Sequence, residues 1–209
     1  MQIIKDHCYK GTRILLGNEK RTLINNMISY LVTEGFTEIS IPIIQHQDTF
    51  NNKIGTENNN LMFNFKDRGD RDICLAPEYT AIIQNLASGI FKYEKDKKLF
   101  YVQECFRGES PQSGRYRQFT QLGVEILNPS QVYDTHILAV DLLKPFGSEN
   151  FDLITDTKRG LDYYKDGKGF EITCDALGSS KQVCGGGSYE GGVGFAIGID
   201  RLLLLKQKI

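Results

Sequence analysis

The sequence predicts an α+β fold built on a mostly antiparallel sheet. Short segments rich in β-branched and aromatic residues alternate as strands do, at several places along the chain. Some of these segments are joined by short polar turns, which is typical of hairpins. Other segments carry apolar residues at helical spacing and lie between and after the strands. This order of elements favours α+β, and we expect a single domain over residues 1–209.

The composition argues against several classes of protein. Of 209 residues, 40% are hydrophobic and 24% are charged, which is enough to build a packed core. The formal net charge of −1 argues against binding nucleic acid through bulk charge, although it is compatible with a local basic groove. No apolar run approaches the ~18–20 residues that span a membrane, and the N-terminus has no signal-peptide pattern. The five cysteines form no CxxC pair, so we expect reduced thiols and a cytoplasmic protein.

In the first half of the chain the pattern predicts a helix, a strand, a hairpin and a second helix. Residues 18–33 are amphipathic, with Asn18 as N-cap, Gly35 as the stop and one apolar face formed by Leu23, Ile24, Met27, Ile28, Leu31 and Val32. Residues 37–44 alternate as a strand, in which Pro42 indicates a sheet edge or an interrupted ladder. The segments 61–65 and 71–75 flank a polar turn and predict a hairpin. Pro77 suits the first position of a helix through residue 90, which puts Glu78 in its first turn.

The second half predicts mainly strands. Residues 98–106 and 118–127 read as paired strands, joined by a polar loop over 108–117. A helix is expected over 130–143, and short strands over 170–174, 181–184 and 192–197. A helix over 199–207 ends the chain. The three histidines are isolated and have no metal-ligand spacing, so we expect no metal site built from them.

The segment from 106 to 121 is the first candidate for function. One strand ends in Arg107, the loop carries Arg115, and the returning strand presents Phe119 and Gln121 on one face because strand side chains alternate. A guanidinium held by a strand suits phosphate oxygens, and a phenylalanine beside it can stack on a base. From composition alone, a solvated hairpin with surface arginines explains this segment more readily.

Three later segments are further candidates for function. Residues 158–164 place an arginine, an acid and two tyrosines together; the ordinary explanation is a turn with a half-buried aromatic pair. Residues 185–192 are rich in glycine, which allows a ligand to approach the backbone closely but also fits a flexible link. Residues 192–202 run from an apolar strand into a helix that begins with Arg201, which fits either a ligand site or a packing helix with a surface ion pair.

Taken together, the four segments FRGE…GRYRQFTQLGVE, RGLDYY, VCGGGSYEG and GFAIGIDRL resemble, in this order, the catalytic domain of class II aminoacyl-tRNA synthetases. The resemblance is strongest to the histidyl branch, which RGLDYY distinguishes. It also includes KGTR at 10–13, TEISIPII at 37–44 and LAPEYT at 75–80, and covers nearly the whole chain. The resemblance implies the class II catalytic fold, with a mostly antiparallel sheet flanked by helices.

The resemblance also implies a reaction and roles for individual residues. In that family the amino acid and ATP form an aminoacyl-adenylate and pyrophosphate, with Mg²⁺ sharing the phosphate charge. Arg107 would hold the α-phosphate, and Arg159 would be the histidyl-type catalytic arginine that stabilises charge on the α-phosphorus. The rest of the implied nucleotide site is Glu109 and Phe119 at the adenine, and Arg115 and Arg201 at the bent β- and γ-phosphates.

For the amino acid, the resemblance implies a site that encloses histidine. Glu78 and Gln121 would bind the α-ammonium group, with Thr80 nearby. Glu125, Tyr164 and Tyr189 would surround the imidazole, and Arg159 would also contact the amino acid. A carboxylate and phenol hydroxyls can satisfy both ring nitrogens, whereas an apolar pocket cannot. We also expect a homodimer, because in class II enzymes the segment around Pro42 forms the subunit contact.

The sequence departs from the family in ways that leave alternatives open. The substitutions are Ala76, Tyr79, Ser110, Thr120, Ser188, Glu190 and Asp200. The family's inserted helical domain between Glu125 and Arg159, a connecting stretch between Tyr189 and Gly194, and the anticodon-binding domain have no counterpart. The acceptor of the activated histidine could be tRNA or another molecule. The alternatives are a non-catalytic histidine-binding regulatory subunit and an engineered catalytic fragment.

Overall fold

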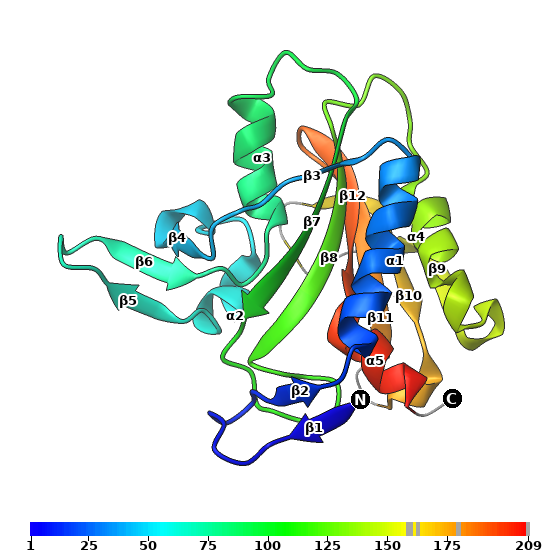
Figure 1. Ribbon diagram of the computed structural model, residues 1–209. Helices are drawn as coiled ribbons and strands as arrows, with labels where there is room; N and C mark the ends of the chain where they lie inside the picture. Colours follow the sequence, from blue (N-terminus) through cyan, green and yellow to red (C-terminus); the bar gives the residue numbers. More distant parts are fainter. Residues whose placement is uncertain (158–160, 162–163, 179–180, 208–209) are drawn as a thin grey trace.

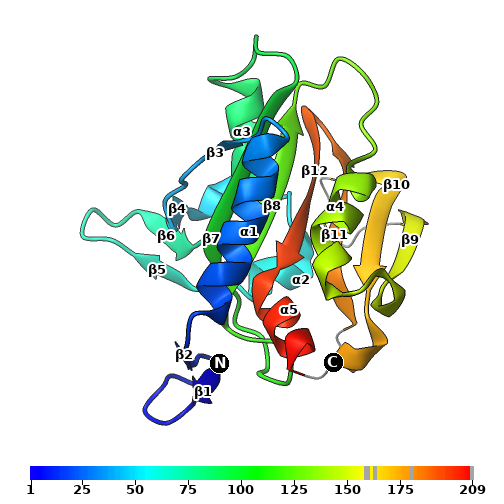
Figure 2. The same cartoon turned by 45° about the vertical axis from the view of Figure 1, so that its right-hand side comes forward.

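The fold is organised around a seven-stranded sheet with the strand order β3-β7-β8-β12-β11-β10-β9 (Figures 1 and 2). This computed structural model describes the chain except for residues 158–160, 162–163, 179–180 and 208–209 and the side chains of 165–167. All strand pairs in this sheet are antiparallel except β3 with β7. The strands are β3 (Thr37–Glu38), β7 (Lys97–Phe106), β8 (Gln118–Leu127), β9 (Asp152–Thr157), β10 (Tyr164–Thr173), β11 (Gln182–Tyr189) and β12 (Gly192–Gly198).

Helices and two smaller sheets surround this sheet. A hairpin pairs β1 (Gln2–Ile4) with β2 (Ile14–Leu16), and a second small sheet has the order β4-β6-β5. Its strands are β4 (Ile44–His46), β5 (Asn64–Lys66) and β6 (Asp72–Leu75). The α-helices are α1 (Glu19–Thr33), α2 (Gly55–Asn60), α3 (Thr80–Ser88), α4 (Thr135–Leu143) and α5 (Ile199–Lys206). Short 3-10 turns cover Gln47–Thr49, Lys144–Phe146, Ser148–Asn150 and Asp175–Leu177.

The two faces of the large sheet belong to different parts of the core. Because side chains alternate along a strand, Phe100 packs with α1, α4 and α5, whereas Leu99 and Tyr101 pack with α3 and its neighbours. The same alternation puts Leu122 and Val124 on the first face and Gln121 and Glu125 on the second. Figures 1 and 2 show α1, α4 and α5 together on one side of the sheet, with α3 and the small sheet on the other.

Most of the predicted elements are present, with shifted boundaries. The amphipathic helix runs from Glu19 to Thr33 after Asn18, and Gly35 follows it at a φ of +82°. The hairpin pairs Lys66 with Asp72, and the strands predicted over 98–106 and 118–127 form the antiparallel pair β7–β8. Val32, predicted for the buried face of the helix, is 57% exposed. The expectation of a single domain stays a prediction.

Four predicted elements differ in detail. The strand over 37–44 is interrupted, which is one of the two possibilities that Pro42 indicated: only Thr37–Glu38 joins the large sheet, and the chain pairs again from Ile44 in a different sheet. Pro42 lies in the gap, where it has no N–H to give to a ladder. The helix predicted from Pro77 begins at Thr80, and the one predicted from 130 begins at Thr135. The glycine-rich segment 185–192, which also fitted a flexible link, is mostly strand, with a turn only at residues 190 and 191.

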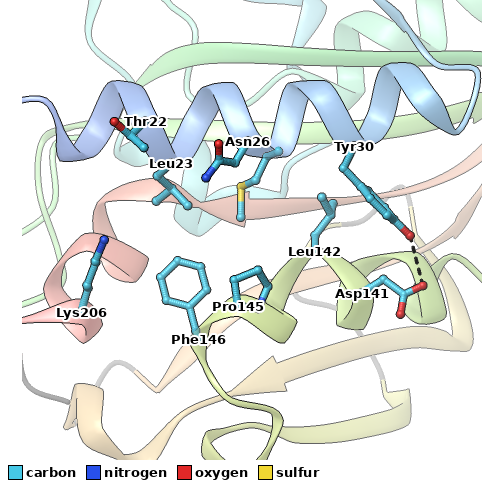
Figure 3. A pocket seen from close by; sticks show the side chains of 10 residues that line it. Thr22, Leu23, Asn26, Tyr30, Asp141, Leu142, Pro145, Phe146 and Lys206 are labelled. Atoms are coloured by element: carbon cyan, nitrogen blue, oxygen red, sulfur yellow. Dashed lines mark hydrogen bonds between the residues drawn. The ribbon is translucent and has the colours of Figure 1, made fainter.

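A groove of about 470 Å³ lies on the helical side of the molecule, between α1, α4 with the turn after it, and α5 (Figure 3). Its walls are mainly apolar, from Leu23, Met27, Leu142 and Phe146. At one end the Tyr30 hydroxyl donates a hydrogen bond to Asp141 at 3.2 Å. This groove is separated by the sheet from the residues that the sequence singles out, so it is not the candidate site.

Candidate functional site

The candidate site lies on the other face of the sheet, where two adjoining compartments share the same lining residues. The larger has a volume of about 640 Å³ and the smaller about 140 Å³. Both contact strands β8 and β12 and the start of α5. The residues that line both are Arg107, Glu109, Arg115, Gln121, Gln182, Ala196 and Arg201. The volume suits a small-molecule ligand.

Glycines make the floor of this site. The strand register places Gly123, Gly185, Gly187, Gly192, Gly194 and Gly198 on the site face of β8, β11 and β12. A Cβ at Gly194 would lie 1.9 Å from Glu125 Oε2, and one at Gly123 would lie 2.0 Å from Tyr101 Cζ. The absent side chains therefore leave the space that the polar side chains fill.

Three arginines converge at one end of the site. Arg107, which directly follows the last residue of β7, donates from Nε to the Pro77 carbonyl at 2.9 Å. Arg115 Nε lies 3.6 Å from Glu109 Oε2, and Arg201 donates from Nε to the Gly114 carbonyl at 3.0 Å and from Nη1 to the Gln182 carbonyl. All three guanidinium groups line the smaller compartment.

The charges of this end are unbalanced. Burial lowers the pKa of Arg201; Glu109 opposes this shift, and the positive charges of Arg107 and Arg115 add to it. Glu109 is the carboxylate that opposes the shift, while the other carboxylate that lines the smaller compartment, Asp200, is paired with Arg13. A polyanion would relieve this repulsion, which makes the arginine end a candidate phosphate site.

Phe119 stands beside these arginines. The Arg107 guanidinium carbon lies 5.3 Å from the centroid of the Phe119 ring, within the range of a cation–π contact. Phe119 and Gln121 both line the smaller compartment, as their predicted position on one face requires. An aromatic ring next to converging cations can accept a nucleobase by stacking.

Beside the larger compartment lies a buried hydrogen-bonded network around Glu125, which Thr80 joins to the lining. The Glu125 side chain is 1% exposed, and its Oε2 accepts a hydrogen bond from the Tyr189 hydroxyl at 2.6 Å while Oε1 accepts one from Thr80 Oγ1 at 3.0 Å. Burial raises the pKa of Glu125 to about 8; the two hydrogen bonds oppose this, and Glu78 adds to it. A carboxyl group with such a pKa favours its protonated form at neutral pH.

Glu78 lies just before α3 rather than in its first turn. Its Oε2 accepts the Thr80 N–H at 2.8 Å and its Oε1 accepts the Ala81 N–H at 2.9 Å, so it caps the helix from outside. The side chain is buried and lines the larger compartment. Each carboxylate oxygen has a second lone pair, and the cap fixes where that lone pair points.

Gln121 joins the two ends of the site. It lies in both compartments, and its Oε1 accepts a hydrogen bond from Cys105 Sγ at 3.1 Å. Tyr164 lines the larger compartment, and its ring centroid lies 6.4 Å from that of Tyr189 in an edge arrangement. Of the residues predicted for the amino acid, Glu78, Thr80, Gln121 and Tyr164 line the larger compartment. Glu125 and Tyr189 line neither compartment and are buried beside the larger one, where Glu125 is hydrogen-bonded to Thr80 and to Tyr189. Arg159 lies outside the described residues.

Several residues line the larger compartment without having been predicted, and two of them lie on strands opposite a glycine. Glu171 occupies the site face of β10, opposite Gly185, and Tyr101 occupies that of β7, opposite Gly123. What marks these two residues is their strand partner: each is paired with a glycine on the neighbouring strand, and a glycine on a buried face leaves room for the side chain opposite. Finding this pairing needs the register, which the sequence pattern did not supply.

Comparison with known proteins gives a consistent result. Residues 17–153 match the family model described as histidyl-tRNA synthetase. A histidine–tRNA ligase of Clostridioides difficile is 28% identical over 308 residues, which covers 93% of this chain and 73% of that protein. The crystal structure of apo S. aureus histidyl-tRNA synthetase superimposes with a TM-score of 0.74 and 28% identity, covering 98% of this chain and 71% of that one. These matches confirm the predicted class II synthetase fold.

A third match concerns the fold alone. An ATP phosphoribosyltransferase regulatory subunit/histidyl-tRNA synthetase from Bacillus halodurans gives a TM-score of 0.76 at 15% identity, covering 98% of this chain and 83% of that one. The C. difficile alignment extends over 308 residues, whereas this chain has 209, so that relative carries internal sequence with no counterpart here. This agrees with the predicted absence of inserted segments.

Proposed function

Since the chain belongs to the histidyl-tRNA synthetase family, we propose that it activates histidine with ATP, forming histidyl-adenylate and releasing pyrophosphate. One observation carries the proposal. Three arginines converge at one end of the site, and at the other end Thr80 joins the lining to a buried network of carboxyl and phenol groups. An anionic nucleotide and a small amino acid with a cationic ammonium group would lie at these two ends side by side.

At the arginine end the proposed role is electrostatic. Arg107 would bind the α-phosphate, Arg115 and Arg201 the β- and γ-phosphates, and Phe119 the adenine, with Glu109 beside it. Fixed cations stabilise the charge that develops during attack on the α-phosphorus, and this needs no protein nucleophile. The resemblance gives Arg159 the same role at the α-phosphorus.

At the other end, Glu125, Tyr189 and Tyr164 would surround the imidazole. A carboxyl group can share a proton with one ring nitrogen, and a phenol can donate to or accept from the other. Glu78 and Gln121, with Thr80, would hold the α-ammonium group. A site of this kind rejects an amino acid whose side chain leaves these buried groups unpaired.

Mg²⁺ would arrive with the nucleotide. Among the described residues no group of three or more His, Cys, Asp or Glu side chains could hold a metal ion. We propose that the ion is bound mainly by phosphate oxygens and water, which is usual where Mg²⁺ serves nucleotide chemistry. The ion would share the triphosphate's charge with the arginines.

The acceptor and the assembly belong to the same proposal. Transfer to tRNA or to another acceptor would follow activation. A homodimer is proposed because β3 lies at an edge of the large sheet and Ile44 and Val32 are exposed apolar side chains near it in sequence. No described helix is long and apolar enough to cross a membrane.

The test is exchange of label between pyrophosphate and ATP, run with each amino acid in turn. Exchange with histidine and with no other amino acid is expected. Phe119→Leu should weaken ATP binding by about 1–3 kcal/mol through lost stacking, whereas Phe65→Leu, on the exposed hairpin, should leave it unchanged. A folded protein that exchanges with no amino acid would refute the proposal. Histidine binding without ATP binding would instead favour the regulatory-subunit alternative.

A further inference from the structure

The N-terminal hairpin packs on the loop that carries Arg115. Figure 1 shows β1 and β2 beside the connection from β7 to β8. The Arg117 N–H donates to the Gly11 carbonyl at 2.8 Å, and Arg117 Nη1 donates to the Tyr9 hydroxyl at 3.1 Å. Gly11 has a φ of +86°, and a Cβ there would lie 2.7 Å from Arg117 Cγ. The two segments therefore meet closely enough to require glycine.

Arg13 extends this contact into the interior. Its guanidinium carbon lies 3.4 Å from the centroid of the Tyr116 ring, and its Nη2 pairs with Asp200 Oδ1. The two charged side chains are only 7% and 5% exposed. Asp200 Oδ2 also accepts the Thr120 N–H at 2.5 Å, which fixes the carboxylate against β8. One buried guanidinium thus bridges the loop and the first turn of α5.

The neighbours of the bridged residues are the proposed phosphate ligands. Tyr116 follows Arg115 in the loop, and Asp200 precedes Arg201 in α5. Loop and helix are also linked directly, by the hydrogen bond from Arg201 to the Gly114 carbonyl. In the proposed function the Arg201 guanidinium binds a phosphate, so it would have to give up this hydrogen bond. The link through Arg13 uses neither of the proposed ligands, so it can hold the two segments together while Arg201 changes partners.

Arg13 is incompletely satisfied where it sits. Its Nε and Nη1 are buried and have no hydrogen-bond partner among the described residues. Buried guanidinium groups normally fill their donors, because an unmade hydrogen bond in the interior is unfavourable. The stack on Tyr116 and the ion pair with Asp200 therefore hold Arg13 in place, although two of its donors have no hydrogen bond among the described residues.

We propose that Arg13 is a positioning residue of the nucleotide site: it ties the loop of Arg115 to the helix of Arg201, so that both guanidinium groups meet one triphosphate. The inference rests on the proposed function, since it assumes that these two arginines bind phosphate. Arg13 itself lines neither compartment, so it acts through Tyr116 and Asp200.

The experiment measures binding of ATP, inorganic tripolyphosphate and histidine by calorimetry. Arg13→Lys keeps the charge but loses the planar stack and the fork. It should weaken binding of ATP and of tripolyphosphate by about tenfold or more, and leave histidine binding within about twofold. Arg21→Met, on the exposed side of α1, is the control and should change none of the three. Tyr116→Leu removes the stack and keeps the ion pair, so it stands in if the Arg13 variant does not fold.

A double-mutant cycle tests whether Arg13 acts through Asp200. Asp200→Asn should weaken tripolyphosphate binding in the same way, and the combination with Arg13→Lys should add little to either change, because both break one link. Unchanged phosphate binding in Arg13→Lys, an equal loss of histidine binding, or fully additive effects would each overturn the inference. A wild-type protein that binds histidine but neither phosphate probe would overturn the proposed function instead.

Discussion

The affinity for histidine should depend on pH because one proton is shared between the ligand and Glu125. Burial raises the pKa of this carboxyl group to about 8. The imidazole of free histidine titrates near pH 6.5. Between these two values, carboxyl and imidazole together hold one titratable proton before binding. They can pair through that proton without exchanging any with solvent.

Outside this window, binding must be accompanied by proton exchange. Above about pH 8 neither partner carries the proton, so binding takes one up and affinity falls about tenfold for each further pH unit. Below about pH 6.5 both partners are protonated, so binding releases one and affinity falls at the same rate. We therefore expect a plateau between these values and, near pH 9, a loss of about tenfold caused by Glu125.

Calorimetry in buffers of different ionisation enthalpy measures both the affinity and the number of protons exchanged. Glu125→Gln is the control, because it removes the titrating group and keeps a side chain of similar shape. The variant should bind histidine more weakly at neutral pH and should lose the alkaline decline that belongs to Glu125, while any decline from the ligand's own amino group remains. Identical alkaline declines in both proteins, or no proton uptake near pH 9, would show that this reasoning is wrong.

The same carboxyl group also affects folding. The unfolded chain gives up this proton near pH 4.5, whereas the native protein keeps it until about pH 8. In that window the native state binds more protons, so the free energy of unfolding falls as pH rises, by up to about 4–5 kcal/mol. Denaturant melts between these pH values measure the effect: the free energies of unfolding of wild type and Glu125→Gln should converge as the pH falls toward 4.5.

Three further predictions concern packing, chemistry and assembly. Gly194→Ala should destabilise the fold by roughly 1–3 kcal/mol and abolish histidine binding, since the new Cβ would overlap Glu125, whereas Gly69→Ala in the exposed hairpin turn should do neither; melts and calorimetry measure both. Arg159→Ala should lower the exchange rate by about 2.7–4 kcal/mol while ATP binding stays nearly intact, and unchanged turnover would exclude a catalytic role. Sedimentation should find a dimer at micromolar concentration, which Ile44→Glu dissociates and Ile90→Glu does not; a monomeric wild type would contradict the proposed contact.

The elements that the sequence predicted well are those whose pattern is local. The strand pair around the arginine loop was placed almost to the residue, because long alternating segments on both sides of a polar loop leave little choice of register. The first helix was equally clear, with Asn18 before it and Gly35 after it. The resemblance to a family indicated which side chains share a site, and most of those described line the two adjoining compartments, whereas Glu125 and Tyr189 are buried beside them.

Two features that the sequence did not predict have different causes. Pro77 favours a helix start, but the Glu78 carboxylate accepts the next N–H groups and caps the helix from outside, so the first helical residue is Thr80. This contact is local, and the pattern left open which residue caps the helix. The role of Arg13 depends on Tyr116 and Asp200, which are far from it in the chain, and no pattern or spacing indicates contacts that need three segments in their final places.

The alternation of small and large residues along β12 explains how this fold makes room for the site. In GVGFAIG the large residues Val193, Phe195 and Ile197 all pack into the core, whereas the small residues between them face the ligand site. A strand with this pattern builds a core on one face and leaves room on the other. The backbone stays in the ladder, so the removal of side chains does not weaken the sheet's hydrogen bonding. A site of this kind forms in the middle of a rigid sheet, and that rigidity holds Glu125 and Gln121 in fixed relation to the arginines.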